Sequence, residues 1–120
     1  MTKTIQTDLN KIVQIIVQEF QPERIILFGS FTNNQEKLGS DFDLFIIKNT
    51  TKREIDRVRE LRSILPRQRK YGIDLVILNE QEFQQATKEK NIFVSKILNT
   101  GKELYAKNAR SHNLVKSGTR

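Results

Sequence analysis

Apolar residues along this chain recur first at a helical period and then in short continuous runs. In residues 5–20 they fall within an arc of about 140° when plotted at the helical period, which predicts an amphipathic helix. Gln21-Pro22 ends this helix, because proline has no amide hydrogen to donate and forces the residue before it out of the helical region. The run Arg24–Phe28 is rich in β-branched residues and is followed by Gly29, so it predicts a buried strand.

The middle of the chain predicts a second strand and a second helix. Residues 41–47 are apolar on both faces after Asp43, which is typical of a strand inside a sheet. Thr51 with Glu54 three residues later has the spacing of a capping box, and Pro66 would end the helix that follows. Apolar residues follow the cap at helical spacing: Ile55, Val58, Leu61 and Leu65. The polar segment 31–39 is expected to be a loop with room for one helical turn.

The remaining segments continue the alternation of strands and helices. The apolar run Ile73–Leu78 predicts a third strand, and Asn79 with Glu82 predicts the cap of the next helix. The last predicted elements are a polar helix at residues 80–89, a helix at 91–98 and a short edge strand at 103–105. Three apolar residues of the second of these helices are expected in the core: Ile92, Phe93 and Ile97. Gly101 is placed to stop that helix.

The length of 120 residues suits one domain with a modest core. We expect residues 1–106 to form that domain, and residues 107–120, which contain almost no apolar side chains, to be a basic mobile or partner-ordered tail. The chain has no cysteine, no signal-peptide pattern and no apolar run near the roughly 18 residues that cross a bilayer. We therefore expect a soluble cytoplasmic protein that does not enter a membrane.

The net charge of +7 is unevenly distributed. Residues 52–70 contain eight basic and three acidic side chains, and residues 107–120 contain four basic and no acidic ones. Such a field favours an acidic partner, and nucleotide phosphates and nucleic acid both satisfy it. No recognition helix, zinc site or interleaving of aromatic and basic residues accompanies the charge, so we do not expect nucleic acid as the partner.

The connections between the predicted strands bring four polar residues to one end of the sheet. The short gap between the first two strands permits an antiparallel pair, whereas a helical crossover normally joins parallel strands. Ser30 ends the first strand, Asp41 and Asp43 begin the second, and Asp74 lies near the start of the third. All of them therefore arrive at the same sheet end, in an α+β fold with a small mixed sheet flanked by helices.

Three carboxylates at one place repel one another and raise each other's pKa unless a cation lies among them. Their hard oxygen atoms suit Mg²⁺ or Mn²⁺, and two ions bound by Asp41 and Asp43 would serve an in-line displacement. Asp74 would complete the site or help to take the proton from an attacking hydroxyl. Gly29 lets the backbone approach a phosphate closely, and the hydroxyl of Ser30 can donate to it. The sequence therefore predicts nucleotidyl transfer from a triphosphate.

These residues resemble a known family. Phe28-Gly29-Ser30, ten further residues and Asp41-Phe42-Asp43 are similar to the Gly-Ser-x10-Asp-x-Asp motif of the DNA polymerase β-type nucleotidyltransferase superfamily. The segments 71–76 and 97–105, together with the small size, are similar to the minimal nucleotidyltransferases, or MNT proteins. The resemblance covers roughly residues 5–105. In one respect the chain differs, because Phe31-Thr32-Asn33-Asn34 stands where many members have arginine and glycine.

The resemblance implies a polymerase β-like fold, ATP with Mg²⁺ as the donor, and a toxin with a HEPN domain as the partner. MNT antitoxins of this kind transfer AMP to a tyrosine of that toxin. The same resemblance implies that Asp41, Asp43 and Asp74 are catalytic metal ligands and that Gly29 and Ser30 bind the nucleotide.

Two other functions remain open from the sequence. The protein could transfer a nucleotide to a small molecule, although related enzymes that do so usually add a second domain for the acceptor. It could also be an antitoxin without catalytic activity that neutralises the toxin by binding alone, which the complete set of three aspartates disfavours. Metal-dependent transfer of label from ATP separates the enzyme from the antitoxin without catalytic activity.

Overall fold

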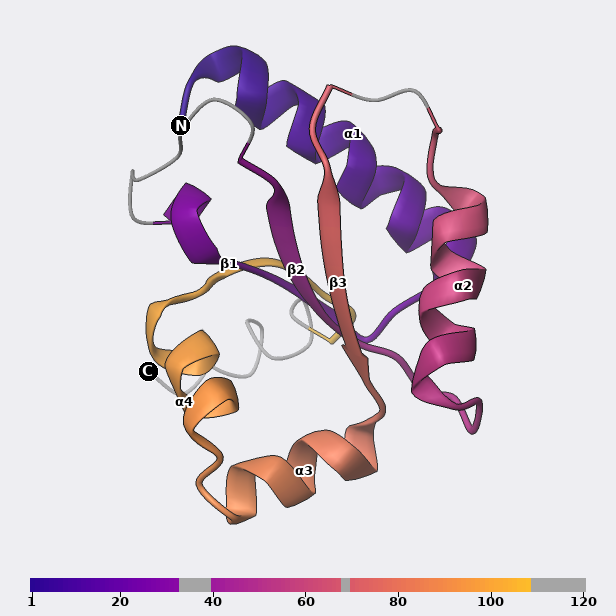
Figure 1. Ribbon diagram of the computed structural model, residues 1–120, viewed down its shortest axis with the longest axis vertical. Coiled ribbons are helices and arrows are strands. Elements are labelled where there is room, and N and C mark those ends of the chain that lie inside the picture. The colour runs from indigo at the N-terminus through magenta and orange to yellow at the C-terminus, as the bar shows by residue number, and fades with distance from the viewer. Residues whose placement is uncertain (33–39, 68–69, 109–120) are drawn as a thin grey trace.

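A four-stranded mixed sheet with helices on both faces forms the body of the protein in a computed structural model, which describes residues 1–32, 40–67 and 70–108 (Figure 1). The elements in chain order are α1 (Lys3–Phe20), β1 (Arg24–Phe28), the 3₁₀ turn η1 (Gly29–Thr32), β2 (Phe42–Ile47), α2 (Glu54–Ile64), β3 (Ile73–Leu78), α3 (Glu80–Lys88), α4 (Ile92–Thr100) and β4 (Lys102–Ala106). The predicted α+β class with a small mixed sheet is confirmed.

The order of the strands across the sheet is β3-β2-β1-β4. The neighbours β1 and β2 pair antiparallel, β2 and β3 pair parallel through the crossover helix α2, and β4 joins the free edge of β1 antiparallel. These pairings confirm the predicted topology, including the short edge strand near the end of the domain. They also bring the end of β1 and the starts of β2 and β3 to the same end of the sheet.

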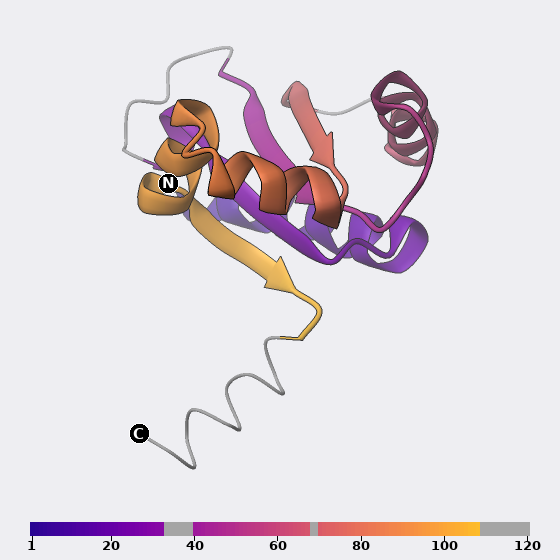
Figure 2. The ribbon, with the colours of Figure 1, turned by 90° about the horizontal axis from the view of Figure 1, so that it is seen from below.

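The sheet separates two apolar layers, because successive side chains of a strand point to opposite faces. Figure 2 shows α1 on one side of the sheet and α3 with α4 on the other. The layer against α1 and α2 includes the strand residues Ile25, Leu27, Phe42, Leu44, Ile46, Ile73 and Ile77. The layer against α3 and α4 includes Ile26, Phe45 and Ile47 with the helix residues Phe83, Val94 and Ile97. Both layers are buried, so β1 and β2 are apolar on both faces.

The predicted cap of α2 is wrong. The helix begins at Glu54 with Arg53 as its N-cap residue, and no side chain closes the cap by a hydrogen bond. Glu54 is therefore the first helical residue and not the third, so it cannot reach back to Thr51. Of the four apolar residues at helical spacing, Ile55 is 57% exposed, whereas Leu61 and Leu65 are buried.

The core positions of α4 differ in part from those predicted. Asn91 caps the helix by accepting a hydrogen bond from the backbone amide of Val94. With this start, Val94 and Ile97 lie three residues apart on the face toward the sheet and are buried. Ile92 is 85% exposed and Phe93 is 46% exposed, so neither belongs to the buried core. Gly101 ends the helix as expected.

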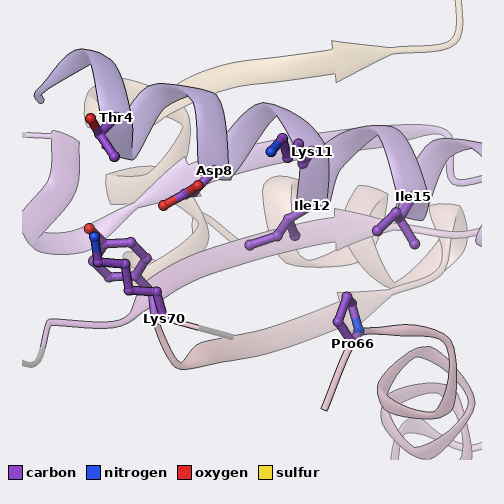
Figure 3. A pocket seen from close by; sticks show the side chains of 8 residues that line it. Thr4, Asp8, Lys11, Ile12, Ile15, Pro66 and Lys70 are labelled. Carbon is purple, nitrogen blue, oxygen red and sulfur yellow. The ribbon is translucent and has the colours of Figure 1, made fainter. Parts of the chain in front are cut away.

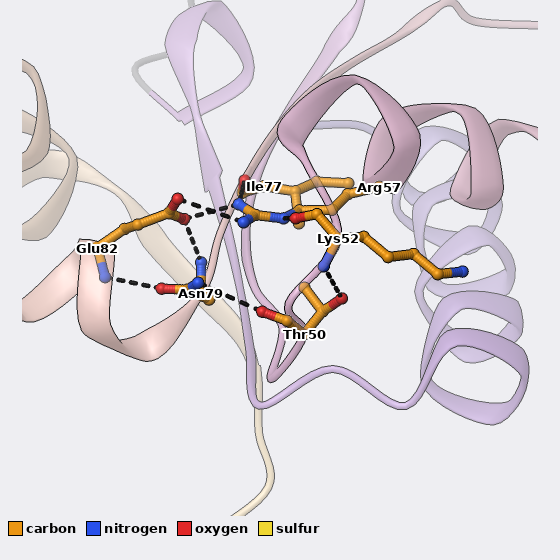
Figure 4. A network of polar contacts seen from close by, with 6 residues as sticks. All are labelled: Thr50, Lys52, Arg57, Ile77, Asn79 and Glu82. Carbon is orange, nitrogen blue, oxygen red and sulfur yellow. Dashed lines mark hydrogen bonds and ion pairs between the residues drawn. The ribbon is translucent and has the colours of Figure 1, made fainter.

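A buried arginine on α2 joins three elements at the β3 edge of the sheet (Figure 4). The guanidinium of Arg57 donates to the carbonyl oxygens of Lys52 and Ile77 and pairs through two nitrogens with the carboxylate of Glu82 on α3. Glu82 also accepts from the backbone amide of Asn79, whose side chain accepts from the amide of Glu82. The predicted capping box of α3 is therefore confirmed, and the arginine ties it to α2.

The end of the domain lies against β1. The backbone amide of Lys107 donates to the carbonyl oxygen of Glu23 at 2.8 Å, and its ammonium lies 3.7 Å from the carboxylate of Glu23. The rest of the predicted tail, residues 109–120, lies outside the described residues, as do residues 33–39 of the predicted loop. Among the helices that are described, none is long and apolar enough to cross a membrane.

Candidate active site at the end of the sheet

Asp43 and Asp74 lie directly opposite each other on the parallel strands β2 and β3. Their neighbours in the same register, Phe42 and Ile73, belong to the apolar layer against α1. Because side chains alternate along a strand, both carboxylates point to the other face, on the side of α3 and α4. The structure thus brings together two of the three predicted acids.

The turn after β1 lies against the side chain of Asp43. Phe28, the last residue of β1, pairs with Asp43 across the antiparallel strands, and Gly29 follows with a positive φ of 82°. A Cβ atom on Gly29 would lie 3.1 Å from Cγ of Asp43 and still closer to its Oδ2 atom. The missing side chain is therefore what allows the Asp43 carboxylate to lie here. Ser30 is the next residue of this turn, in η1.

Asp41 lies just before β2, against the backbone of Gly72. The amide of Phe42 donates to the carbonyl oxygen of Gly72 at 2.9 Å, which continues the pairing of β2 with β3. A Cβ atom on Gly72 would lie 2.8 Å from Cγ of Asp41. Gly72 is a positioning residue that we did not predict from the sequence, although a glycine directly before the strand with the third aspartate was a signal that could have found it.

The electrostatics of the site are dominated by Asp43. Burial raises the pKa of its carboxyl, a hydrogen bond to Asp74 raises it further, and the negative charges of Asp74 and Asp41 add to the effect, so that the pKa reaches about 6. A raised pKa with these causes identifies a group of carboxylates that lacks a balancing positive charge. Asp43 is therefore within electrostatic reach of both other predicted acids, Asp41 and Asp74.

This donor set fits a hard divalent cation. Carboxylate oxygens are the ligands that Mg²⁺ prefers, and a cation would remove the repulsion that raises the pKa of Asp43. In residues 1–32, 40–67 and 70–108, no three acidic, cysteine or histidine side chains already stand in the arrangement of a finished metal centre. The side chains of Asp43 and Asp74 lie within hydrogen-bond reach of each other and Asp41 lies beside Gly72, so the carboxylates would have to turn to bind one ion together.

A cavity of about 420 Å³ opens elsewhere, between α1 and the segment before β3 (Figure 3). It is lined by Thr4, Asp8, Lys11, Ile12, Ile15, Pro66, Lys70 and Tyr71. Ile12 belongs to the apolar layer on the α1 side of the sheet, whereas the carboxylates of Asp43 and Asp74 point to the other side. The cavity is therefore separate from the group of acids, and we place the candidate active site at the acids.

Comparison with known proteins gives the family. The sequence profile described as "Polymerase beta, Nucleotidyltransferase" matches residues 10–110. No curated protein sequence matches the chain. Three solved structures are similar in fold, each with 20% sequence identity.

The first is a Sulfolobus solfataricus protein assigned as a nucleotidyltransferase; the match covers 66% of this chain and 70% of that protein, with a TM-score of 0.52. The second is a toxin-antitoxin with AMP-PNP; the match covers 86% of this chain and 77% of the other chain, with a TM-score of 0.56. The third is the toxin-antitoxin MntA-HepT; the match covers 89% of this chain and 77% of the other chain, with a TM-score of 0.52. At this identity the structures show a shared fold, whereas the profile spans most of the chain including every predicted site residue. The chain therefore belongs to the polymerase beta nucleotidyltransferase family.

Proposed function

We propose that the protein is a Mg²⁺-dependent protein adenylyltransferase that transfers AMP from ATP to a tyrosine of a HEPN-domain toxin and thereby acts as its antitoxin. The observation that carries the proposal is the paired Asp43 and Asp74, with Asp41 beside them and the Gly29-Ser30 turn against Asp43. This arrangement combines cation ligands with a phosphate-binding turn at one end of a sheet in a nucleotidyltransferase fold.

Asp41, Asp43 and Asp74 would hold two Mg²⁺ ions together with the phosphates of ATP. Such ions, when bound, neutralise the carboxylates and withdraw electrons from the phosphate oxygens. Asp43 must release its proton to act as a ligand, and its pKa of about 6 leaves it ionised at neutral pH. The site is thus ready for a cation at the pH of most cells.

The turn after β1 would hold the triphosphate. The positive φ of Gly29 turns the backbone toward the acids, and the hydroxyl of Ser30 can donate a hydrogen bond to a phosphate oxygen. The acceptor oxygen then forms a bond to the α-phosphorus, the bond from this phosphorus to the bridging oxygen breaks, and pyrophosphate leaves. Asp74, on the strand beside Asp43, is the group that we assign to take the proton of the acceptor hydroxyl.

The proposed partner rests on the structural neighbours and on charge. Two of the similar structures are toxin-antitoxin complexes, one of them with AMP-PNP and one of MntA with HepT. The basic stretch at residues 52–70 favours an acidic partner surface.

The test is the transfer of label from α-labelled ATP to the co-expressed HEPN partner in the presence of Mg²⁺. We expect labelled partner with the wild type, and none with the double variant Asp41→Asn/Asp43→Asn. The matched control is Asp8→Asn/Glu19→Gln, which removes the same charge from α1 on the other side of the sheet and should leave transfer intact. A mass spectrum of the labelled partner then locates the modified residue.

Two results would replace the proposal with an alternative. If the wild type transfers no label while the double variant still binds and silences the partner, the protein is an antitoxin that acts by occlusion. If label appears on a small molecule in a cell extract and not on the partner, the acceptor is not a protein.

A further inference from the structure

An aromatic pair joins the candidate active site to helix α4. Phe28 pairs with Asp43 across the antiparallel strands, so their side chains stand on one face with Cβ atoms about 5 Å apart. The ring of Phe93, in the first turn of α4, meets the ring of Phe28 edge to face, with the centroids 5.6 Å apart and an interplanar angle of 89°. Phe93 is thus in contact with Phe28, the residue that borders Asp43.

Packing in the buried core does not account for an aromatic side chain at position 93. The α4 residues that pack in the layer against the sheet are Val94 and Ile97, which are each 3% exposed. Phe93 remains 46% exposed, and its ring contacts the ring of Phe28. A half-exposed ring that a second ring fixes in place is a rigid apolar surface.

We propose that Phe93, held by Phe28, is the platform on which the base of the bound nucleotide stacks. The proposal rests on the proposed function and adds a binding subsite to it. Phe28 directly precedes the Gly29-Ser30 turn assigned to the phosphates, so Phe93 contacts the residue next to the phosphate site. A single aromatic ring makes no hydrogen bond to the edge of a base. The subsite therefore accepts every base and shows little preference among them.

The exposed part of Phe93 is large enough for one planar base. A phenylalanine side chain has an area of the order of 200 Å², so its exposed part is roughly 100 Å². A base would need the ring of Phe93 alone. A partner protein would also have to cover the neighbouring Ile92, which is 85% exposed, because a stable interface takes about 800 Å² from each partner.

The experiment compares the binding of ATP with that of inorganic tripolyphosphate, which has the charged groups but no base. Both are titrated calorimetrically in Mg²⁺ into the wild type, Phe93→Ala, Phe93→Leu, Phe93→Tyr and the control Ile92→Ala. We expect Phe93→Ala to weaken ATP binding by about 5- to 100-fold and to leave tripolyphosphate binding unchanged. Phe93→Leu, which keeps an apolar contact with Phe28, should also weaken ATP binding, whereas Phe93→Tyr and Ile92→Ala should bind ATP as the wild type does.

The outcomes distinguish this subsite from the proposed function. If Phe93→Ala binds ATP as tightly as the wild type, the stacking platform is wrong and the nucleotide site stands. If Phe93→Ala loses ATP and tripolyphosphate equally, the ring supports the phosphate site and does not contact the base. If the wild type binds neither ligand, the proposed function fails and the subsite fails with it. If the partner protein binds more weakly to both Phe93→Ala and Ile92→Ala while ATP binding is intact, the side chains of Phe93 and Ile92 contact the partner and not the base.

Discussion

Asp43 and Asp74 lie opposite each other on the parallel pair of β2 and β3, where burial and a hydrogen bond between the two side chains raise the pKa of Asp43. Such a contact between two acids is unfavourable once both are ionised, because the charges repel at short range. It exists only because the strand register places the two residues opposite each other. The protein therefore keeps a destabilising feature at the end of its sheet, which is typical of a site that serves function and not stability.

This relationship predicts that Asp43→Asn stabilises the protein in the absence of divalent cations above pH 6. The pKa of Asp43 is raised from 3.8 to about 6 in the folded protein, so between these values the folded state holds a proton that the unfolded chain has lost. The free energy of unfolding therefore falls as the pH rises through this window and stays low above it. An uncharged amide removes this loss, and solvent screening at the partly exposed side chain reduces the gain to about 1 kcal/mol.

Urea unfolding at pH 3.5 and at pH 7.5 in EDTA measures this effect. The gain should be present at pH 7.5 and much smaller at pH 3.5, where Asp43 is mostly protonated in both states. Addition of Mg²⁺ at pH 7.5 should then stabilise the wild type and have little effect on the variant. A variant that is less stable than the wild type at pH 7.5 in EDTA would show that Asp43 is not destabilising.

Gly29→Ala should reduce both stability and activity. The positive φ of 82° costs a residue with a Cβ atom about 1–2 kcal/mol, and this Cβ would collide with Oδ2 of Asp43. The matched control is Gly72→Ala, which has no positive φ but places a Cβ 2.8 Å from Cγ of Asp41. We expect Gly72→Ala to lose transfer activity with a smaller loss of stability, because the carboxylate of Asp41 can turn away. Equal unfolding free energies for the two variants would contradict the role of backbone conformation at Gly29.

Most of the fold follows from local sequence patterns. Pro22 and Gly29 delimit β1, the asparagine cap marks the start of α3, and the lengths of the connections decide which strand pairs are antiparallel or parallel. The same topology brings the ends of the strands that carry Asp43 and Asp74 together, so the shared position of the acids could be predicted without coordinates. That the two residues lie directly opposite, and that Asp41 fits against Gly72, depends on the register of β2 and β3, which are far apart in the sequence. The glycine directly before β3 was the one local signal of this close approach.

The wrong predictions have one physical cause, which is that tertiary contacts choose among local patterns of similar strength. Thr51 and Glu54 have the spacing of a capping box, yet α2 begins at Glu54, where Arg57 can reach Glu82 on α3. Ile92 and Phe93 are as apolar as Val94, yet the cap at Asn91 turns Val94 toward the sheet. Neither choice is visible in a single stretch of sequence.

The two predicted caps give a direct comparison. The side chain of Asn79 accepts from the amide of Glu82 at 2.8 Å and donates to the carbonyl oxygen of Thr50 at 3.3 Å, so Asn79→Ala should destabilise the protein by about 1 kcal/mol. Thr51 caps no helix, so Thr51→Ala should change the unfolding free energy by less than about 0.5 kcal/mol. Thermal unfolding of the two variants measures the contrast, and equal losses would show that Thr51 contributes to the start of α2.

Arg57→Ala should be strongly destabilising, because this buried side chain holds α2, β3 and α3 together. Its loss leaves the carbonyl oxygen of Ile77 without the donor that it has at 3.1 Å and breaks the 2.6 Å pair with Glu82. Glu82 is 44% exposed and can be hydrated again, so we expect the free energy of unfolding to fall by about 2–3 kcal/mol, which is below the largest values for buried ion pairs.

Arg59→Ala, on the same helix, is the control. The side chain of Arg59 is 73% exposed and 3.4 Å from Asp56, so its removal should lower the free energy of unfolding by less than about 0.5 kcal/mol. Similar unfolding free energies for the two variants in urea would mean that the Arg57 network contributes no more than a surface ion pair.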